Sequence, residues 1–166
     1  MKYEKNKPFS NAIFIKILDF YLFNCPVVFD NGRIVSNNSK NFDKLKYDKK
    51  RYLKLNNSIR KSLGTCYYCL DNDESVENVY KNMKDSNNKK DDYFEFIIFK
   101  KNSELNKTQS MFYCIRNAIA HNSFTFVCKG NKYIYYFENI KNGVLSGKIR
   151  LKEDTLLYYI ELVKKC

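Results

Sequence analysis

The chain has 166 residues, of which 44% are hydrophobic and 16% are aromatic, and its formal net charge is +12. This composition excludes an intrinsically disordered protein, and the length suits a single domain spanning residues 1–166 with a core of its own. The positive charge indicates a polyanionic partner. Part of it reflects a bias towards lysine, which outnumbers arginine by 25 to 5 and is frequent in proteins encoded by AT-rich genomes.

The sequence predicts a reduced, cytoplasmic protein with no membrane partner. No apolar run reaches membrane-spanning length, and the apolar stretch at residues 12–23 is interrupted by Lys16 and Asp19, which argues against a signal peptide. Six cysteines are therefore expected as thiols. Cys66 and Cys69 form a CxxC pair, but a zinc site needs four ligands and the chain has one histidine. We expect no metal.

The N-terminal half contains two predicted helices. Residues 1–8 are expected to fray, and apolar residues at helical spacing predict a helix over residues 9–24 with Ser10 as its N-cap. Residues 27–39 are expected to form a loop. The second helix covers residues 40–63 and ends at Gly64.

The helix at residues 40–63 is strongly basic, with nine lysine or arginine residues against two aspartates. Its candidate RNA-binding residues are Lys49, Lys50, Arg51 and Lys54. A solvated helix face with no partner is the alternative interpretation of the same pattern.

The C-terminal half begins with a short helix at residues 73–83 and a polar loop at residues 84–92. Residues 93–100 are apolar enough for a helix or a strand, and a helix is favoured. Ser103 is expected to cap the next helix, which runs to about His121.

A change of pattern follows that helix. Three short segments rich in β-branched and aromatic residues are separated by turn signals, and they predict strands at residues 123–128, 132–137 and 144–151. A closing helix is expected at residues 154–165. The predicted fold is therefore mainly α, a helical bundle with a small antiparallel β-meander (residues 123–151) inserted before the C-terminal helix.

The segment most informative about function is the helix that ends near His121. Its apolar stripe is expected to face the core, and it consists of Met111, Phe112, Ile115, Ala118 and Ile119. The only histidine of the chain and one of five arginines, Arg116, fall on the other side with Asn117, which is an i,i+4 neighbour of His121. A histidine can transfer protons near neutral pH, and an arginine can hold a phosphate. These groups suffice for cutting RNA at its own 2′-hydroxyl, although an ordinary polar helix face has the same pattern.

The sequence Arg116-Asn117-Ala118-Ile119-Ala120-His121 resembles the Arg-x4–6-His motif of HEPN domains. It is most similar to stand-alone bacterial members whose motif is followed by a β-hairpin. The resemblance implies an all-helical fold, pairing of two chains through the motif helix as a homodimer, and endoribonuclease activity without a metal or cofactor. It also implies a toxin or anti-phage (abortive infection) role, with an antitoxin or regulatory protein as a possible partner.

The resemblance also implies roles for individual residues. Arg116 would bind and polarise the scissile phosphate, His121 would act as general acid or base, and Asn117 would orient one of them. Tyr113 and Asn122, beside the motif, are further candidate RNA contacts. In some relatives an antitoxin modifies a tyrosine two positions after the histidine, and Ser123 occupies that position here.

Two alternatives remain open from the sequence. A non-catalytic module of the same fold would use Arg116 as a phosphate clamp and His121 as a hydrogen-bond donor. A DNA-binding protein driven by charge alone would show steep salt dependence and no sensitivity to His121.

Overall fold

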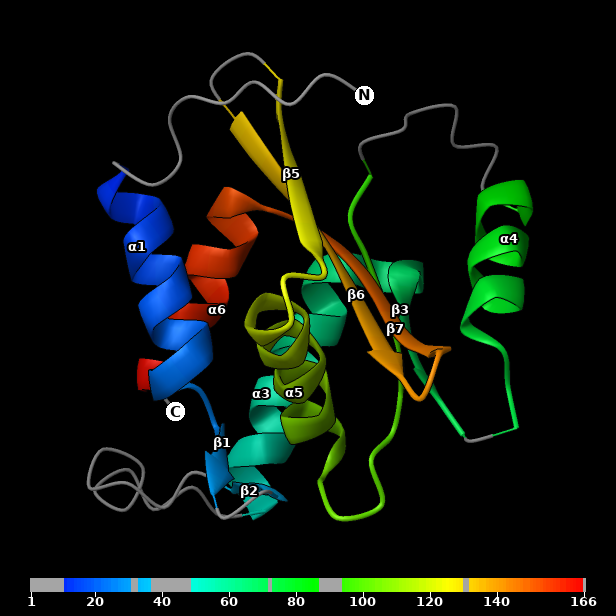
Figure 1. The fold of residues 1–166 in the computed structure, drawn as a ribbon, viewed down its shortest axis with the longest axis horizontal. Helices are drawn as coiled ribbons and strands as arrows, with labels where there is room; N and C mark the ends of the chain where they lie inside the picture. The colour runs from blue at the N-terminus through cyan, green and yellow to red at the C-terminus, as the bar shows by residue number, and fades with distance from the viewer. Residues whose placement is uncertain are drawn as a thin grey trace.

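The computed structural model describes residues 11–30, 33–36, 49–71, 73–86, 94–129 and 132–165, without the side chains of residues 29, 30 and 33–36. Its centre is a mixed sheet of five strands in the order β3-β4-β7-β6-β5 (Figure 1). In that order the strands are Tyr67–Leu70, Phe96–Lys100, Val144–Lys152, Lys132–Lys141 and Phe124–Lys129. β3 and β4 run parallel, and every other neighbouring pair is antiparallel.

The fold is therefore α/β, and the expectation of a mainly-α helical bundle is wrong. The decisive segment is residues 93–100, which was expected to be a helix and which contains β4. All four residues from Phe96 to Phe99 are buried, as in a strand covered on both faces, and such a continuous apolar run has no periodicity that separates strand from helix. A second strand, β3, lies at the CxxC pair, where no strand was expected.

One face of the sheet carries most of the helices. These are α1 (Ala12–Asp19), the π-helical turn η2 (Phe20–Asn24), α3 (Lys49–Leu63), α5 (Lys107–Ala120) and α6 (Glu153–Lys165). Aromatic packing joins η2 to α5, since the ring of Phe112 lies 5.8 Å from that of Tyr21 and 6.2 Å from that of Phe20. The buried aromatic and aliphatic side chains between these helices and the sheet form the larger core.

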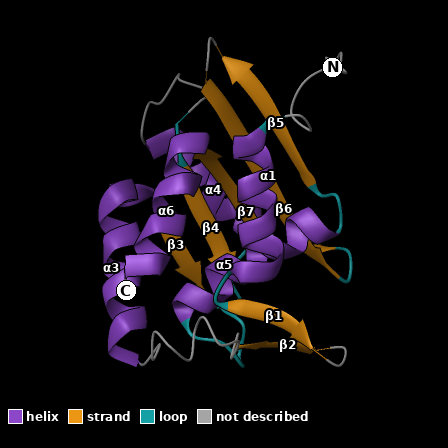
Figure 2. Ribbon diagram, turned by 90° about the vertical axis from the view of Figure 1, so that its left-hand side faces the viewer, coloured by secondary structure: helices purple, strands orange, loops and turns teal. Residues whose placement is uncertain are grey.

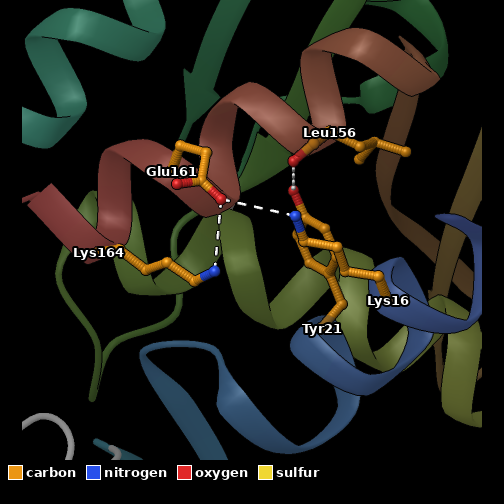
Figure 3. Close-up of polar contacts among 5 residues, drawn as sticks. All are labelled: Lys16, Tyr21, Leu156, Glu161 and Lys164. Carbon is orange, nitrogen blue, oxygen red and sulfur yellow. Dashed lines mark hydrogen bonds and ion pairs between the residues drawn. The ribbon is translucent and has the colours of Figure 1, made fainter.

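Polar contacts tie α1 and η2 to α6 (Figure 3). The hydroxyl of Tyr21 donates a hydrogen bond to the carbonyl oxygen of Leu156 at 3.3 Å. On the surface, the carboxylate of Glu161 lies 3.6 Å from Nζ of Lys16 and 3.3 Å from Nζ of Lys164. The N-terminal and C-terminal helices are thus held side by side.

The other face of the sheet is covered by α4 (Val76–Ser86), which packs on β4 and β7 and lies on the side of the sheet away from α1 and α6 in Figure 1. Val76 and Met83 of this helix form a second, smaller core with Phe96 and Ile98 of β4. Among the described residues, α4 is the helix that packs on this face, and it leaves the β5 and β6 half of the face uncovered.

The N-terminal part of the chain differs in detail from expectation. The first helix begins after the N-cap Asn11, whose side chain accepts a hydrogen bond from the backbone of Ile13, whereas Ser10, the predicted cap, lies outside the described residues. Residues 27–39 were expected to be a loop. They contain the antiparallel hairpin β1 (Val27–Asp30) and β2 (Arg33–Ser36), which lies apart from the main sheet in Figure 2.

Other predicted boundaries also moved. The basic helix was expected over residues 40–63, and its described part, α3, covers Lys49–Leu63 before a short 3-10 turn, η3 (Gly64–Cys66). The short helix expected at residues 73–83 extends to Ser86, and residues 1–8 and 40–48 lie outside the described part. No described helix is long and apolar enough to cross a membrane.

Helix α5 begins with a capping box, and its N-cap differs from the predicted one. Asn106 and not Ser103 is the N-cap, because its side chain accepts from the backbone of Gln109 at 2.9 Å. The Gln109 side chain in turn accepts from the backbone N–H of Asn106 at 3.2 Å. This reciprocal pair fixes the start of the helix that carries the Arg-x4-His motif.

The three strands predicted after α5 are confirmed as β5, β6 and β7, but they form part of the larger sheet. Close packing of α5 on this sheet depends on Gly147 of β7, which pairs with Asn139 of β6 and Phe99 of β4. A Cβ atom at Gly147 would lie 2.8 Å from Sγ of the buried Cys114. The missing side chain therefore lets α5 approach the sheet.

Candidate functional site

The apolar stripe predicted for α5 is confirmed. Its members are all buried: Met111, Phe112, Ile115, Ala118 and Ile119. Along the rest of the helix, Tyr113, Arg116 and Asn117 are partly buried, whereas Ala120 and His121 are exposed. α5 is thus a core helix, and its side chains that could take part in a reaction reach solvent at its C-terminal end.

The backbone around His121 is fixed by a Schellman motif. His121 is the C-cap, and the N–H groups of Asn122 and Ser123 donate to the carbonyls of Ile119 at 3.1 Å and Ala118 at 2.7 Å. Asn122 adopts a left-handed conformation with φ 54°, which asparagine tolerates better than other non-glycine residues. The motif therefore fixes the backbone from which the exposed imidazole extends.

Arg116 contacts the N-terminal part of the chain. Its Nε donates to the carbonyl oxygen of Leu22 in η2 at 3.3 Å. Burial raises the pKa of the nearby Cys25 thiol to about 11, and the Val27 backbone and the Arg116 charge offset part of that rise. One edge of the guanidinium is thus used to hold η2 against α5, while the side chain keeps partial solvent access.

Asn117 belongs to a buried polar network. Its amide donates to Oδ1 of Asn139, and Nδ2 of Asn139 lies 3.5 Å from Sγ of Cys114. Desolvation raises the pKa of the Cys114 thiol to about 12. Asn117 thus uses its side chain to contact the sheet, although its i,i+4 spacing would let it reach the side chain of His121. The two residues are joined through the backbone, where the N–H of His121 donates to the carbonyl of Asn117 at 3.0 Å.

Asn139 was not among the residues predicted from the sequence. It is 2% exposed and lies where the register of β6 and β7 shifts. Its backbone carbonyl accepts from Oγ of Ser146 at 2.9 Å. The available signal was its phase in β6, because Asn139 continues the inward-facing series that Tyr135 and Phe137 begin.

The predicted RNA-binding residues fall into two separate groups. Lys49, Lys50 and Lys54 are exposed on α3, and Arg51 is half-buried. A shallow hollow of about 420 Å³ lies on this face, lined by Lys50, Leu53, Lys54, Asn57, Ser58 and Lys61.

These α3 lysines lie near the N-terminal end of α5. Oγ1 of Thr108, in its first turn, donates to the carbonyl of Tyr52 at 3.0 Å. His121 follows thirteen residues later, about 20 Å along the helix axis. The structure therefore does not bring the α3 lysines together with His121.

The other two predicted contacts lie closer to the motif. Tyr113 is half-buried on α5, and burial raises the pKa of its hydroxyl. Asn122 is exposed beside His121.

The chemistry available at this end of α5 is proton transfer and anion binding. Within the described ranges, no group of three or more His, Cys, Asp or Glu side chains is arranged to hold a metal ion. Cys66 is buried in the smaller core, Cys69 is half-buried on β3, and no disulfide joins the described cysteines. Burial raises the pKa of the Cys69 thiol, which disfavours its reactive thiolate form.

Substitutions of Asn122 separate its backbone role from any contact of its side chain. Asn122→Gly should leave the midpoint of thermal unfolding unchanged or slightly higher, whereas Asn122→Ala should cost about 1 kcal/mol, because only the glycine variant accepts positive φ without strain. Thermal unfolding followed by circular dichroism measures both. Equal destabilisation by the two variants would contradict the Schellman assignment.

Comparison of the chain with protein-family models, with curated proteins and with solved structures finds no match. The resemblance to HEPN domains accordingly depends on the motif in α5 alone, since the all-helical fold that it implied is not observed.

Proposed function

We propose that this chain is a metal-independent endoribonuclease in which His121 transfers protons and Arg116 binds the scissile phosphate. The observation that carries the proposal is the placement of His121. It is the only histidine of a strongly basic chain, and it lies exposed at the end of a core helix whose cap fixes its backbone. Arg116, five residues earlier on the same helix, is partly exposed and provides a cation.

The reaction needs two proton transfers. A base removes the proton of the 2′-hydroxyl, the 2′-oxygen attacks the phosphorus, and an acid protonates the departing 5′-oxygen. The products are a 2′,3′-cyclic phosphate and a 5′-hydroxyl. The positive charge of Arg116 would stabilise the negative charge that develops on the phosphoryl oxygens.

A chain with one histidine supplies one imidazole, so a second copy would provide the other proton-transfer group. We propose a homodimer in which the C-terminal ends of two α5 helices meet, because the preceding turns of α5 are largely buried in their own core. In this arrangement both His121 side chains would line one cleft. The pairing predicted through the motif helix would then involve only the exposed end of α5.

The proposed setting is the cytoplasm, with cellular or phage RNA as substrate and a toxin or abortive-infection role. An antitoxin or regulatory protein would restrain the activity. These assignments follow from the motif resemblance and from the net charge of +12.

A second candidate is a non-catalytic nucleotide- or partner-binding module. The hydrogen bonds of Arg116 to Leu22 and of Asn117 to Asn139 favour it, because they give two of the three predicted catalytic side chains a structural role. Under this alternative the protein binds a nucleotide or a partner protein and does not cut RNA.

A single-atom change in the substrate tests the proposed chemistry. We expect an RNA oligonucleotide to be cut and the same oligonucleotide with one 2′-deoxy sugar at the cleavage position to resist cutting there, because the attacking oxygen is missing. Gel analysis of both substrates is the measurement. Equal cutting of the deoxy position would exclude attack by the 2′-hydroxyl.

A further inference from the structure

A groove lies on the sheet beside α4, at the border of the area that this helix covers. It has a volume of about 480 Å³ and is lined by residues of α4, of all the antiparallel strands and of the turn after α5: Tyr80, Phe96, Asn122, Ser123, Phe124, Thr125, Tyr136, Phe137, Glu138, Ile140, Lys148, Ile149 and Arg150. This volume is in the range of small-ligand sites.

Arg150 supplies a buried positive charge beneath this groove. It is 3% exposed, and its guanidinium carbon lies 4.7 Å, 4.9 Å and 5.2 Å from the ring centroids of Phe94, Phe96 and Tyr136. Such packing against ring faces is an attractive cation–π contact that holds a guanidinium in place. Aromatic rings therefore line this part of the groove, with a buried positive charge behind them.

Lys148 places a second cation in the groove. Its Nζ lies 2.6 Å from Oε1 of Glu138 and 5.0 Å from the ring centroid of Tyr80 on α4. Two cations and one carboxylate among the lining residues leave the groove with a net positive charge. An anionic group is the complementary ligand.

The rim of the groove continues the backbone of the motif. Asn122 and Ser123 line it and directly follow His121 in the sequence. The backbone N–H of Glu138 donates to the carbonyl of Ser123 at 3.0 Å, which joins the end of α5 to the groove floor. A ligand in the groove would thus contact the two residues that directly follow His121.

We infer that this groove binds one nucleotide of single-stranded RNA beside the bond that His121 cuts. Rings of Tyr80 and Tyr136 would stack on the base, Lys148 would pair with the phosphate, and Asn122 and Ser123 offer polar groups to the base edge. A duplex cannot present an unstacked base to such a surface, so the groove selects single strands. The inference rests on the proposed function and adds its substrate class.

Binding of an RNA that cannot be cut tests the groove separately from the chemistry. The probe is a fluorescein-labelled 2′-O-methyl oligouridine of about ten nucleotides, followed by fluorescence anisotropy, because methylation removes the attacking hydroxyl. We expect Lys148→Glu to weaken binding at least about tenfold. Lys165→Glu, which makes the same change of charge at the exposed end of α6, should weaken it about twofold or less. Equal affinities of the two variants would overturn the inference.

Photocrosslinking of wild-type protein covers the case in which Lys148→Glu fails to fold. An oligouridine carrying 5-iodouridine should crosslink to the peptides containing Tyr80 or Tyr136, and crosslinks confined to α3 would overturn the inference. If the protein binds the methylated RNA through the groove but does not cut unmodified RNA, only the proposed nuclease activity is contradicted. Cutting that depends on His121, with no effect of Lys148→Glu on binding, would contradict the groove alone.

Discussion

His121→Ala is expected to lower the rate of RNA cutting by at least about a hundredfold, the usual contribution of a general acid or base. The folded state should be almost unaffected, because the side chain is exposed and the cap of α5 is made by backbone groups. Initial rates on a defined RNA in excess EDTA, with thermal unfolding of both proteins, give the two readouts.

Lys107→Ala is the matched control, since it removes an exposed side chain at the opposite end of the same helix. It should cut RNA at nearly the wild-type rate. Cutting by His121→Ala at the wild-type rate would remove His121 from the mechanism and favour the binding module. Loss of activity together with loss of folding in His121→Ala would contradict the structural account of the helix end.

Ile97→Ala and Ile98→Ala are each expected to lower the free energy of unfolding by about 2–5 kcal/mol. Neighbouring residues on a strand point to opposite faces, and both are fully buried, Ile97 in the larger core and Ile98 in the smaller one. Chemical denaturation of the two variants and wild type measures the effect. A strand covered on both faces requires both losses.

Ile140→Ala is the control for these substitutions, because the same side chain is 52% exposed in β6. It should change stability by about 0.5 kcal/mol or less. A large effect at Ile97 and none at Ile98 would indicate that one of them faces solvent, as on an amphipathic helix, and would contradict the central position of β4.

Periodic segments of this chain were predictable, and the continuous apolar one was not. The stripe of α5 repeats at helical spacing and the strands β5, β6 and β7 are separated by turn residues, so local pattern was sufficient. Phe96–Phe99 is apolar at every position, and only its pairing with β3 and β7 shows that it is a strand. That one segment decides between a bundle and an α/β fold.

The candidate site was likewise predictable only in part. Spacing along α5 predicted which side chains leave the core stripe, but not what those side chains contact. The partner of Arg116 is Leu22, 94 residues away, and the partner of Asn117 is Asn139, 22 residues away. The groove at Arg150 combines α4 with distant strands, so no local motif could indicate it.

The chemical groups at the ends of the cut RNA distinguish attack by the 2′-hydroxyl from metal-dependent hydrolysis. Wild-type protein is incubated with a defined single-stranded RNA in excess EDTA, and the products are analysed by mass spectrometry. We predict fragments that end in 2′,3′-cyclic phosphate and begin with 5′-hydroxyl, because the 2′-oxygen is the proposed nucleophile and the proposed mechanism needs no metal. Fragments with 3′-hydroxyl and 5′-phosphate, or cutting that stops in EDTA, would contradict it.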